Sequence, residues 1–337
     1  MKKIILFRVD GGKVWGVSMG HINRCLLVAK GLPSDCQPIF VMKDYADGVK
    51  FVKAKKVPVV TISTDDNSDD SIIELCEKYK PWKIIVDLLV DPYKFLYKYA
   101  RNNKIGTIVF DVLGKCSSSP DILVNDSLVS KFMAYARLSL KTKKYLGLDY
   151  FVMAKKSIVM PIRDKVREIM ITMGGSDPAG LTLKVIQVLR NTKPLGCKFN
   201  IILGPSYSDD KVVHGLVGND KNFKIVKNPH DFLKLLSKQD IVITSAGRTL
   251  YECAYLGRPA VIAPSIEHES KVAKEYSTRT GSLNIGRWDD AVSPNRVVSA
   301  LVTYIGDNRM RKSISKLSRT LLDGRGRERV IAIINHN

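Results

Sequence analysis

His21 is the residue whose type and setting best suit chemistry. It ends a glycine-rich segment, Asp10-Gly-Gly-Lys-Val-Trp-Gly-Val-Ser-Met-Gly20-His21, which lies between an apolar run and an amphipathic one. Glycines such as Gly20 let backbone N–H groups approach an anion at a helix N-terminus, although the spacing matches no Walker A or Gly-x-Gly-x-x-Gly motif. The helix dipole there favours a neutral imidazole, which can act as a general base on water or a hydroxyl. Helix capping by His21 is an alternative of equal weight.

Two later loops contain residue types that suit a nucleotide diphosphate. The segment Met173-Gly174-Gly175-Ser176-Asp177-Pro178 combines close backbone approach with a hydroxyl donor, which predicts a diphosphate cradle. The segment Thr244-Ser245-Ala246-Gly247-Arg248-Thr249 leads into a helix that carries Glu252, and a carboxylate there can accept both hydroxyls of a ribose. The simpler alternatives are a glycine turn that only redirects the chain and a glutamate that only complements the helix dipole.

Apolar strand-like runs alternate with amphipathic helical segments along the first half of the chain. Apolar strands separated by helices of this length predict a parallel sheet that is covered on both faces. The strand-like runs are Ile4–Val9, Pro38–Met42, Pro58–Ile62, Lys83–Leu88, Gly106–Phe110 and Asp121–Val124, and the helical segments include Ile22–Leu32, Ser71–Tyr79 and Tyr93–Arg101.

A pause in this periodicity separates the first half from a second α/β region. Residues 127–166 are weakly periodic and rich in Lys and Arg, which predicts a linker within 155–166. We therefore predict an α/β fold with two doubly wound, Rossmann-type domains and a ligand cleft between the carboxyl ends of their sheets. The predicted parts are an N-terminal domain (1–157), a second domain with the two later loops (167–307), and C-terminal helices (308–337) that can pack back on the first domain.

The composition is that of a soluble globular protein, with 45% hydrophobic and 26% charged residues among 337. No apolar run reaches the roughly 18–20 residues that span a bilayer, and Arg8 and Asp10 end the first run too early for a signal peptide, so we expect a cytoplasmic location. Six scattered cysteines without C-x-x-C spacing argue against a zinc site or a disulfide framework. The net charge of +21 is spread along the chain without a nucleic-acid-binding motif, which favours a solvated, lysine-rich surface.

Six segments together resemble the GT-B nucleotide-sugar enzymes, and specifically the UDP-sugar hydrolases of the pseudaminic acid pathway. Those enzymes release UDP from a 2,4-diacetamido-2,4,6-trideoxyhexose. The resemblance spans nearly the whole chain, and its segments at 20–26 and 174–178 are fairly specific. The segment at 245–252 is shared more widely with UDP-sugar glycosyltransferases, such as the one that builds the peptidoglycan lipid intermediate. The matching segments are Arg8-Val-Asp-Gly-Gly12, Gly20-His-Ile-Asn-Arg-Cys-Leu26, Leu148-Asp-Tyr150, Gly174-Gly-Ser-Asp-Pro178, Ser245-Ala-Gly-Arg-Thr-Leu-Tyr-Glu252 and Asp323-Gly-Arg-Gly-Arg-Glu-Arg329.

The resemblance implies a role for each matched position. His21 is the expected catalytic residue, which activates or positions water for attack on the anomeric carbon while UDP leaves, with no metal and no other cofactor. The expected contacts of the nucleotide and its diphosphate are Gly20, Gly174, Gly175, Ser176, Ser245, Ala246, Gly247, Arg248, Thr249 and Glu252. The candidates to face the sugar are Arg8, Asp10, Asn23, Glu267, His268 and Glu269.

The chain departs from the family pattern chiefly where the sugar is expected. The first loop is two residues longer than in relatives, with Lys13, Val14 and Trp15 ahead of Gly16. The other departures are Asp87-Leu88-Leu89 where relatives have a polar tyrosine, Phe110-Asp111 in place of two acids, and Ile266-Glu267-His268-Glu269 in place of an Asn-Gln pair. The resemblance therefore supports a nucleotide more strongly than a particular sugar.

Three functions are compatible with these features. The leading hypothesis is a hydrolase that cleaves a UDP-linked deoxy-diacetamido sugar to UDP and free sugar in nonulosonic acid or surface glycan biosynthesis. A GT-B glycosyltransferase with a UDP-sugar donor differs from it by an acceptor hydroxyl in place of water. A non-catalytic protein that binds a nucleotide sugar or nucleic acid through its charge is the third, but His21 and Glu252 in their loop contexts argue against it. We expect a UDP-sugar as the only small-molecule partner, no nucleic acid, and a monomer.

Overall fold

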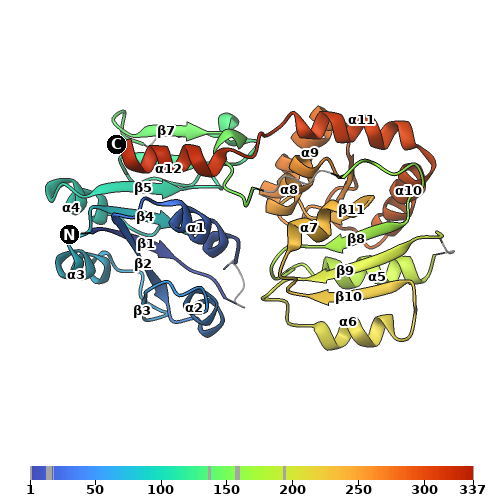
Figure 1. The fold of residues 1–337 in the computed structure, drawn as a ribbon, viewed down its shortest axis with the longest axis horizontal. Helices are drawn as coiled ribbons and strands as arrows, with labels where there is room; N and C mark the ends of the chain where they lie inside the picture. The colour runs from blue at the N-terminus through green and yellow to red at the C-terminus, as the bar shows by residue number, and fades with distance from the viewer. Residues whose placement is uncertain are drawn as a thin grey trace. The chain divides into compact units, whose positions relative to one another are not determined.

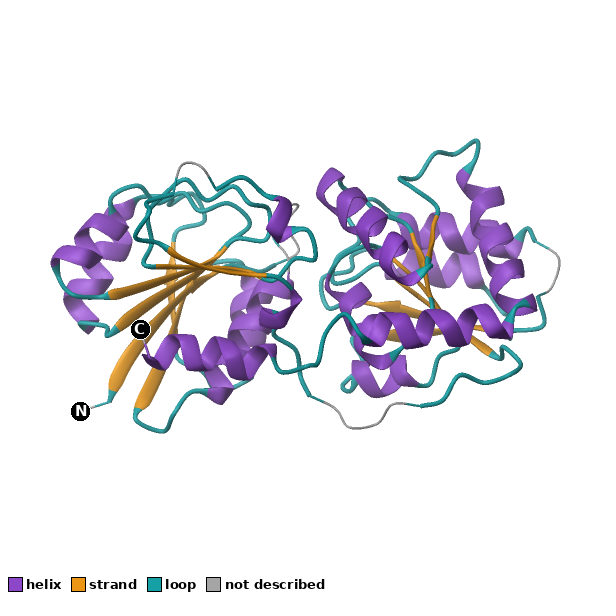
Figure 2. Ribbon diagram, turned by 90° about the horizontal axis from the view of Figure 1, so that it is seen from above, coloured by secondary structure: helices purple, strands orange, loops and turns teal. Residues whose placement is uncertain are grey.

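The computed structural model describes residues 2–12, 17, 19–135, 138–155, 160–192 and 195–336. The chain divides into two units, one formed by Met1–Ala154 with Gly324–Asn337 and the other by Lys155–Asp323. Each unit is built around its own parallel β-sheet with helices on its faces (Figures 1 and 2). The predicted fold class, with two doubly wound α/β domains, is therefore confirmed.

The first unit alternates strands with α-helices from residue 3 to residue 110, and two further strands follow with no α-helix among the described residues between them. One-turn helices lie at Ser130–Phe132 (η1), between these two strands, and at Leu148–Tyr150 (η2). The last helix of the chain, α12 (Gly326–His336), also belongs to this unit. The remaining elements are β1 (Lys3–Val9), α1 (Met19–Gly31), β2 (Cys36–Lys43), α2 (Ala46–Lys53), β3 (Val59–Ile62), α3 (Asp69–Tyr79), β4 (Lys83–Asp87), α4 (Leu96–Asn102), β5 (Gly106–Phe110), β6 (Ile122–Asn125) and β7 (Lys143–Leu146).

The sheet of the first unit has the order β3-β2-β1-β4-β5-β6-β7, and all of its strands are parallel. Its inner strands are apolar on both faces, so helices must cover both. Phe7 and Val9 of β1 pack with α1, α2 and α12 on one face. Leu6 of the same strand packs with α3 and α4 on the other. Arg8 therefore points to the α3 and α4 face, because successive side chains of a strand alternate.

The second unit repeats this plan with a six-stranded sheet. Its elements are β8 (Glu168–Thr172), α5 (Leu181–Arg190), β9 (Lys198–Leu203), α6 (Asp210–Val217), β10 (Phe223–Lys227), α7 (Phe232–Ser237), β11 (Ile241–Thr244), α8 (Arg248–Leu256), β12 (Ala260–Ile262), α9 (Glu267–Thr280), β13 (Leu283–Asn284), α10 (Ser293–Gly306) and α11 (Asn308–Arg319). The strand order is β10-β9-β8-β11-β12-β13, again all parallel. Helices α5, α6 and α10 bury their apolar residues on one face of this sheet.

The C-terminal helices are divided between the units. Helix α11 packs on α8 and α9 of the second unit, and Asp307 caps its start by accepting a hydrogen bond from the Met310 N–H at 2.8 Å. Helix α12 belongs to the first unit and packs against α1 and η2. Gly326 opens α12 directly against the backbone of Phe151, where a Cβ atom would collide with the carbonyl group. Of the expected segment 308–337, α11 therefore belongs to the second unit and α12 to the first.

The structure places a strand at each strand-like run of the first half and helices at all three predicted segments. Helix α2 and strand β7 were not predicted, and β7 lies in the stretch that lacks clear periodicity. All six cysteines are buried and none forms a disulfide. No helix within the described residues is long and apolar enough to cross a membrane.

Candidate active site

The carboxyl edge of the first sheet brings His21 and Asp87 together. Strand β1 lies between β2 and β4, so the chain leaves β1 in one direction for β2 and returns on the other side for β4. Such a reversal of strand order opens a crevice at the carboxyl ends of the strands, which is where ligands bind in doubly wound sheets. Asp87 is the last residue of β4, and His21 lies in the first turn of α1, which follows β1.

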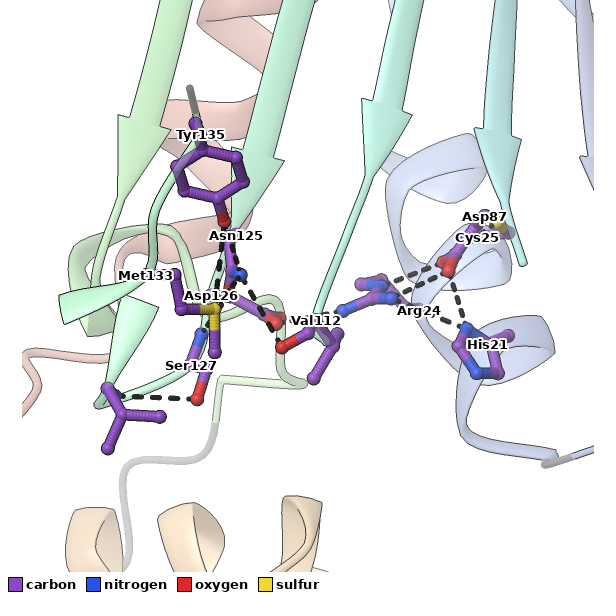
Figure 3. A network of polar contacts seen from close by, with 11 residues as sticks. His21, Arg24, Cys25, Asp87, Val112, Asn125, Asp126, Ser127, Met133 and Tyr135 are labelled. Carbon is purple, nitrogen blue, oxygen red and sulfur yellow. Dashed lines mark hydrogen bonds and ion pairs between the residues drawn. The ribbon is translucent and has the colours of Figure 1, made fainter. Parts of the chain in front are cut away.

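A network of charged hydrogen bonds connects these two residues (Figure 3). His21 Nδ1 lies 2.6 Å from Asp87 Oδ1. Arg24, one turn further along α1, donates to the same carboxylate from Nε to Oδ2 at 2.7 Å and from Nη2 to Oδ1 at 2.6 Å. The other terminal nitrogen of Arg24, Nη1, donates to Asp126 Oδ1 at 2.9 Å. One guanidinium therefore lies between two carboxylates.

The segment after β6 fixes the position of Asp126. Asn125 donates from Nδ2 to the Tyr135 hydroxyl at 2.7 Å, and its Oδ1 accepts from the Ser127 N–H at 2.9 Å. Both neighbours of Asp126 are thereby held, so its carboxylate meets Arg24 in a fixed geometry. Asn125, Asp126 and Ser127 are all buried.

Burial and charge act in opposite directions on Asp87. Its side chain has no exposed surface, and burial alone would raise the pKa of the carboxyl group. The charge of Arg24, the nearby His21 and the hydrogen bonds from both residues outweigh burial and hold the pKa of Asp87 well below its usual range. For Arg24, burial likewise opposes the charge, but Asp126 and Asp87 raise its pKa above the usual value. Asp87 is thus an anion at any physiological pH.

This arrangement assigns the two nitrogens of His21 different tasks. An ionised Asp87 can only accept, so the proton of a neutral imidazole is placed on Nδ1, and Nε2 is left as an acceptor. The His21 side chain is 13% exposed within the described residues, so it is not completely buried. A histidine held by a carboxylate in this way can remove a proton from a hydroxyl group or from water.

A second polar cluster at this edge joins two of the residues expected to face the sugar. Arg8 forms a bidentate pair with Asp10 at 2.6 and 2.8 Å and donates from Nε to the Tyr93 hydroxyl at 2.7 Å. Asp10 also accepts from the Lys43 N–H at 2.8 Å. Because Arg8 points to the α3 and α4 face, this cluster does not share a face of the sheet with the His21 network.

The rest of the first loop contributes less than expected. Asn23 is exposed, and it lies two positions from His21, so the two side chains leave α1 in different directions. Gly20 is the second residue of α1. Gly11 and Gly48 pack so closely that a Cβ atom on Gly48 would overlap the Gly11 carbonyl oxygen. Residues 13–16, including the predicted insertion, and residue 18 lie outside the described part of the chain.

In the second unit, the loop after β8 lies at the corresponding reversal of strand order, between β8 and β11. Gly174 has φ +86°, a conformation that a side chain would strain, and open space lies where its Cβ atom would be. Within the described residues, the N–H groups of Gly175 and Ser176 make no hydrogen bond. The Gly175 carbonyl accepts from the Ser206 N–H at 3.0 Å, which anchors the loop. The loop is therefore built with amides available to an anion.

The backbone N–H groups at the start of α5, in contrast, are not available to an anion. The carboxylate of Asp177 accepts from the N–H groups of Leu181 at 3.0 Å and Thr182 at 2.7 Å. These amides are already satisfied by a negative charge, so an anion has little to gain at this helix end. Any diphosphate at this loop must use the amides at 174–176 instead.

Helix α8 begins without such a cap. Gly247 is its N-cap residue and supplies no side-chain hydrogen bond. The positive end of the helix dipole at such a start favours an anion. The Leu250 N–H already donates to the Gly247 carbonyl at 3.2 Å. Ser245 and Thr249 are nearly buried here, and the hydroxyl of Thr244 at the end of β11 is buried without a hydrogen-bond partner in the described residues. The predicted segment 245–249 thus forms a polar helix start whose N-cap residue has no capping side chain.

Glu252 lies one turn into α8. Its surroundings raise the pKa of its carboxyl group to about 7 by desolvation, while the positive charge of Arg248 acts in the opposite direction. Part of the side chain still reaches solvent, and no hydrogen bond to the carboxylate forms within the described residues. An acid that lacks a partner in a crowded setting is poised to bind a hydroxyl-bearing ligand.

The remaining sugar-facing candidates lie at the start of α9. Glu269 accepts from the Ser265 N–H at 2.8 Å and from the Ser265 hydroxyl at 2.6 Å, and its carboxylate approaches Gly247 at the start of α8. Glu267 is exposed in the first turn of α9 and His268 is half-buried. The described residues contain no group of three or more His, Cys, Asp or Glu side chains that could hold a metal ion.

Sequence reasoning assigned no role to Asp87, Arg24 or Asp126, which the structure joins to His21. Arg24 and Asp126 are separated by 102 positions, and Arg24 and Asp87 by 63. A signal was present, because an aspartate that ends a buried strand of a parallel sheet lies at the ligand-binding edge. The pairing itself depends on strand order, which spacing does not reveal.

Comparison with known proteins agrees with this architecture, although no family model matches the chain. The chain is 22% identical over an alignment of 356 residues to the spore coat polysaccharide biosynthesis protein SpsG of Bacillus subtilis, with 96% of each chain covered. It is 26% identical over 145 residues to the pseudaminic acid cytidylyltransferase and UDP-2,4-diacetamido-2,4,6-trideoxy-beta-L-altropyranose hydrolase of Helicobacter pylori, covering 43% of this chain and 26% of that one. The crystal structure of MurG from Acinetobacter baumannii superimposes with a TM-score of 0.67 over 99% of this chain and 100% of that chain at 15% identity. The chain therefore has the GT-B fold.

Proposed function

We propose that this protein is a nucleotide-sugar enzyme in which His21 activates a nucleophile for attack on the anomeric carbon of a UDP-sugar. The observation that carries the proposal is the hydrogen bond between His21 Nδ1 and the buried Asp87 carboxylate at 2.6 Å. It leaves Nε2 of a partly accessible imidazole as a general base. A histidine that served only to cap α1 would have no use for a buried, ionised partner.

In the hydrolase reaction, water is the nucleophile, His21 is the base and UDP is the leaving group. Nε2 of His21 takes a proton from water as the oxygen attacks the anomeric carbon. The bond from that carbon to the diphosphate oxygen breaks, and its electron pair leaves with UDP. The products are a free sugar, UDP and the protonated imidazolium of His21, which then returns its proton to solvent. Asp87 stays ionised throughout and stabilises the imidazolium while it exists.

Residues of the second unit are proposed to bind the nucleotide. The dipole at the start of α8, where Gly247 offers no capping side chain, suits the charge that grows on the leaving diphosphate. So do the amides of Gly175 and Ser176, which make no hydrogen bond within the described residues. Glu252 suits the two hydroxyls of the ribose, because its carboxylate makes no hydrogen bond within the described residues. Helix ends and Arg248 supply positive charge here, so we propose that no metal is needed and expect UDP release to persist in EDTA.

The nature of the nucleophile defines two versions of this proposal. Similarity over part of the chain to a protein whose name includes a UDP-2,4-diacetamido-2,4,6-trideoxy sugar hydrolase supports water. Similarity over nearly the whole chain to a polysaccharide biosynthesis protein supports an acceptor hydroxyl and hence a glycosyltransferase. The same base serves either, since both nucleophiles lose a proton as they attack. We take the hydrolase as the first version to test, with surface glycan biosynthesis as its setting in both cases.

The test is release of UDP from a panel of UDP-sugars that includes a UDP-2,4-diacetamido-2,4,6-trideoxyhexose, each with and without sugar acceptors. Release without an acceptor supports the hydrolase. Release only with an acceptor contradicts the hydrolase and supports the transferase. If no UDP is released and UDP itself fails to bind in calorimetry, the nucleotide-sugar proposal is wrong in both versions.

A further inference from the structure

Two hydrogen-bond donors meet at one oxygen atom of Asp87. Oδ1 is 2.6 Å from His21 Nδ1 and 2.6 Å from Arg24 Nη2, and these two nitrogens are 3.5 Å from each other. Arg24 is a permanent cation. A second proton on His21 would therefore place two positive charges side by side on a single carboxylate oxygen.

We propose that Arg24 offsets the charge of Asp87 at His21, so that Asp87 orients the imidazole without holding it protonated at neutral pH. The inference rests on the proposed function, in which His21 must be neutral to act as a base. Arg24 and Asp126 contact no reacting group, so they are positioning residues that act through Asp87. A buried aspartate that paired with His21 alone would favour the imidazolium and so lower the fraction of His21 that is available as a base.

The burial of Arg24 makes this offset strong. Its side chain is 2% exposed, and its guanidinium lies 4.6 Å from the centre of the Phe110 ring. Charges that are buried away from water are screened little. The Arg24 guanidinium, whose Nη2 atom lies 3.5 Å from His21 Nδ1, therefore acts on the imidazole more strongly than an exposed guanidinium at the same distance would. Asp126 anchors the far side of the guanidinium, which keeps Arg24 from swinging toward solvent.

The other titratable groups around His21 in the described part of the chain do not reproduce this effect. On α1, Cys25 lies against Asp87 with its Sγ atom 3.5 Å from Oδ2. On β4 the facing group is Asp87 itself, and after β6 it is Asp126, on the far side of Arg24. At the end of β1, Asp10 is paired with Arg8 on the opposite face of the sheet. Among the residues that the structure describes, Arg24 is thus the cation positioned to balance Asp87.

The test is the titration of His21 followed by NMR in the full-length protein labelled at histidine Cε1. The chain has five histidines, and the signal of His21 is assigned by its loss in His21→Gln. We expect the midpoint of the His21 titration to rise by roughly one to two pH units in Arg24→Met, as expected for loss of a neighbouring cation. Arg24→Lys should keep the midpoint near that of the wild type. Asp126→Asn should leave it unchanged or lower it, because a more distant negative charge has been removed.

Two further variants keep the test decisive. If Arg24→Met does not fold, the double variant Arg24→Met/Asp126→Asn removes both members of the buried pair and should still raise the midpoint, by less than the single change. Arg279→Met is the matched control, because it removes an exposed arginine from an ion pair with Glu275 in the other unit and should shift nothing. A midpoint that is the same in the wild type, Arg24→Met and the double variant overturns the inference.

The outcome is distinguishable from failure of the proposed function. The titration requires no substrate, so a shifted midpoint with no UDP release from any UDP-sugar leaves the charge offset standing and rejects the enzyme assignment. The converse result is a rate of UDP release that falls at low pH with the same midpoint in the wild type and the double variant. That result supports the enzyme assignment and overturns the role of Arg24.

Discussion

Replacement of Asp87 by asparagine should destabilise the first unit strongly. The Asp87 carboxylate accepts three hydrogen bonds of 2.6–2.7 Å from His21 and Arg24. An asparagine has an NH2 group in place of one carboxylate oxygen. In either orientation of the amide, this NH2 group faces a His21 or Arg24 donor from which it cannot accept a hydrogen bond. The buried Arg24 charge is then left with Asp126 as its carboxylate partner. Breaking a buried ion pair from one side typically costs about 3–5 kcal/mol, and we expect a loss of free energy of unfolding in that range.

The measurement is urea unfolding at pH 7, followed by tryptophan fluorescence in a Trp15→Phe/Trp288→Phe background. The remaining tryptophan, Trp82, packs against the core of the first unit, so the signal reports on that unit. Asp35→Asn is the matched control, because it removes an exposed carboxylate that pairs with Lys3 at 3.1 Å, and its transition should coincide with that of the wild type.

The difference in unfolding free energy between wild type and Asp87→Asn should also change with pH in one direction. The pKa of Asp87 is lowered in the folded protein, so the stability it provides is complete above the unfolded value of about 3.9 and is lost as the pH falls through the folded value. The part of the gap between wild type and Asp87→Asn that comes from the ionisation of Asp87 itself should therefore be constant from pH 5 to 8 and narrow only in strong acid. A variant within about 1 kcal/mol of the wild type at pH 7 would refute the reasoning, because a buried pair cannot be broken at so little cost.

Variants of Glu252, Gly326 and Gly215 should also differ in stability or in UDP binding. Because burial raises the pKa of Glu252 to about 7, its ionisation opposes folding at higher pH, so Glu252→Gln should match the wild type near pH 4 and exceed it by roughly 1–3 kcal/mol at pH 8 in urea unfolding. The same variant should bind UDP more weakly in calorimetry, and equal affinity would remove Glu252 from the site. Gly326→Ala should cost roughly 1–3 kcal/mol in thermal or urea unfolding, since the added Cβ atom meets the Phe151 carbonyl. Gly215→Ala, in open space on α6, should be neutral or slightly stabilising, and similar losses in both glycine variants would contradict the packing of α12.

Local patterns were sufficient to predict most of the fold. Buried strands such as β4 and β11 are continuous apolar runs, and amphipathic helices such as α5 show the helical period, so both are visible in sequence. Strand β7 was missed because its residues, Lys143 to Leu146, are exposed or half-buried at the edge of the sheet and carry two lysines. Helix α2 was missed because it is short and contains Gly48, whose presence reflects close packing against Gly11 rather than a turn.

The candidate site was predicted less completely. His21 and the two glycine-rich loops follow strands directly, so their placement at a sheet edge could be inferred from the chain. The partners of His21 could not, because Asp87 and Asp126 reach it only through the strand order β1-β4-β5-β6. The resemblance also named Arg8 and Asp10 as candidates to face the sugar, but it could not show that alternation along β1 sends Arg8 to the face of the sheet opposite the His21 network.

The central claim is that His21 supplies the base for cleavage of a nucleotide sugar. The most direct measurement is the single-turnover rate of UDP release from a UDP-sugar that the wild type cleaves, compared between wild type and His21→Ala, with UDP affinity measured on both proteins. Loss of a general base predicts a rate lower by roughly 10²–10⁴-fold with UDP affinity within about twofold. An unchanged rate in His21→Ala would contradict the account, whatever else the variant does.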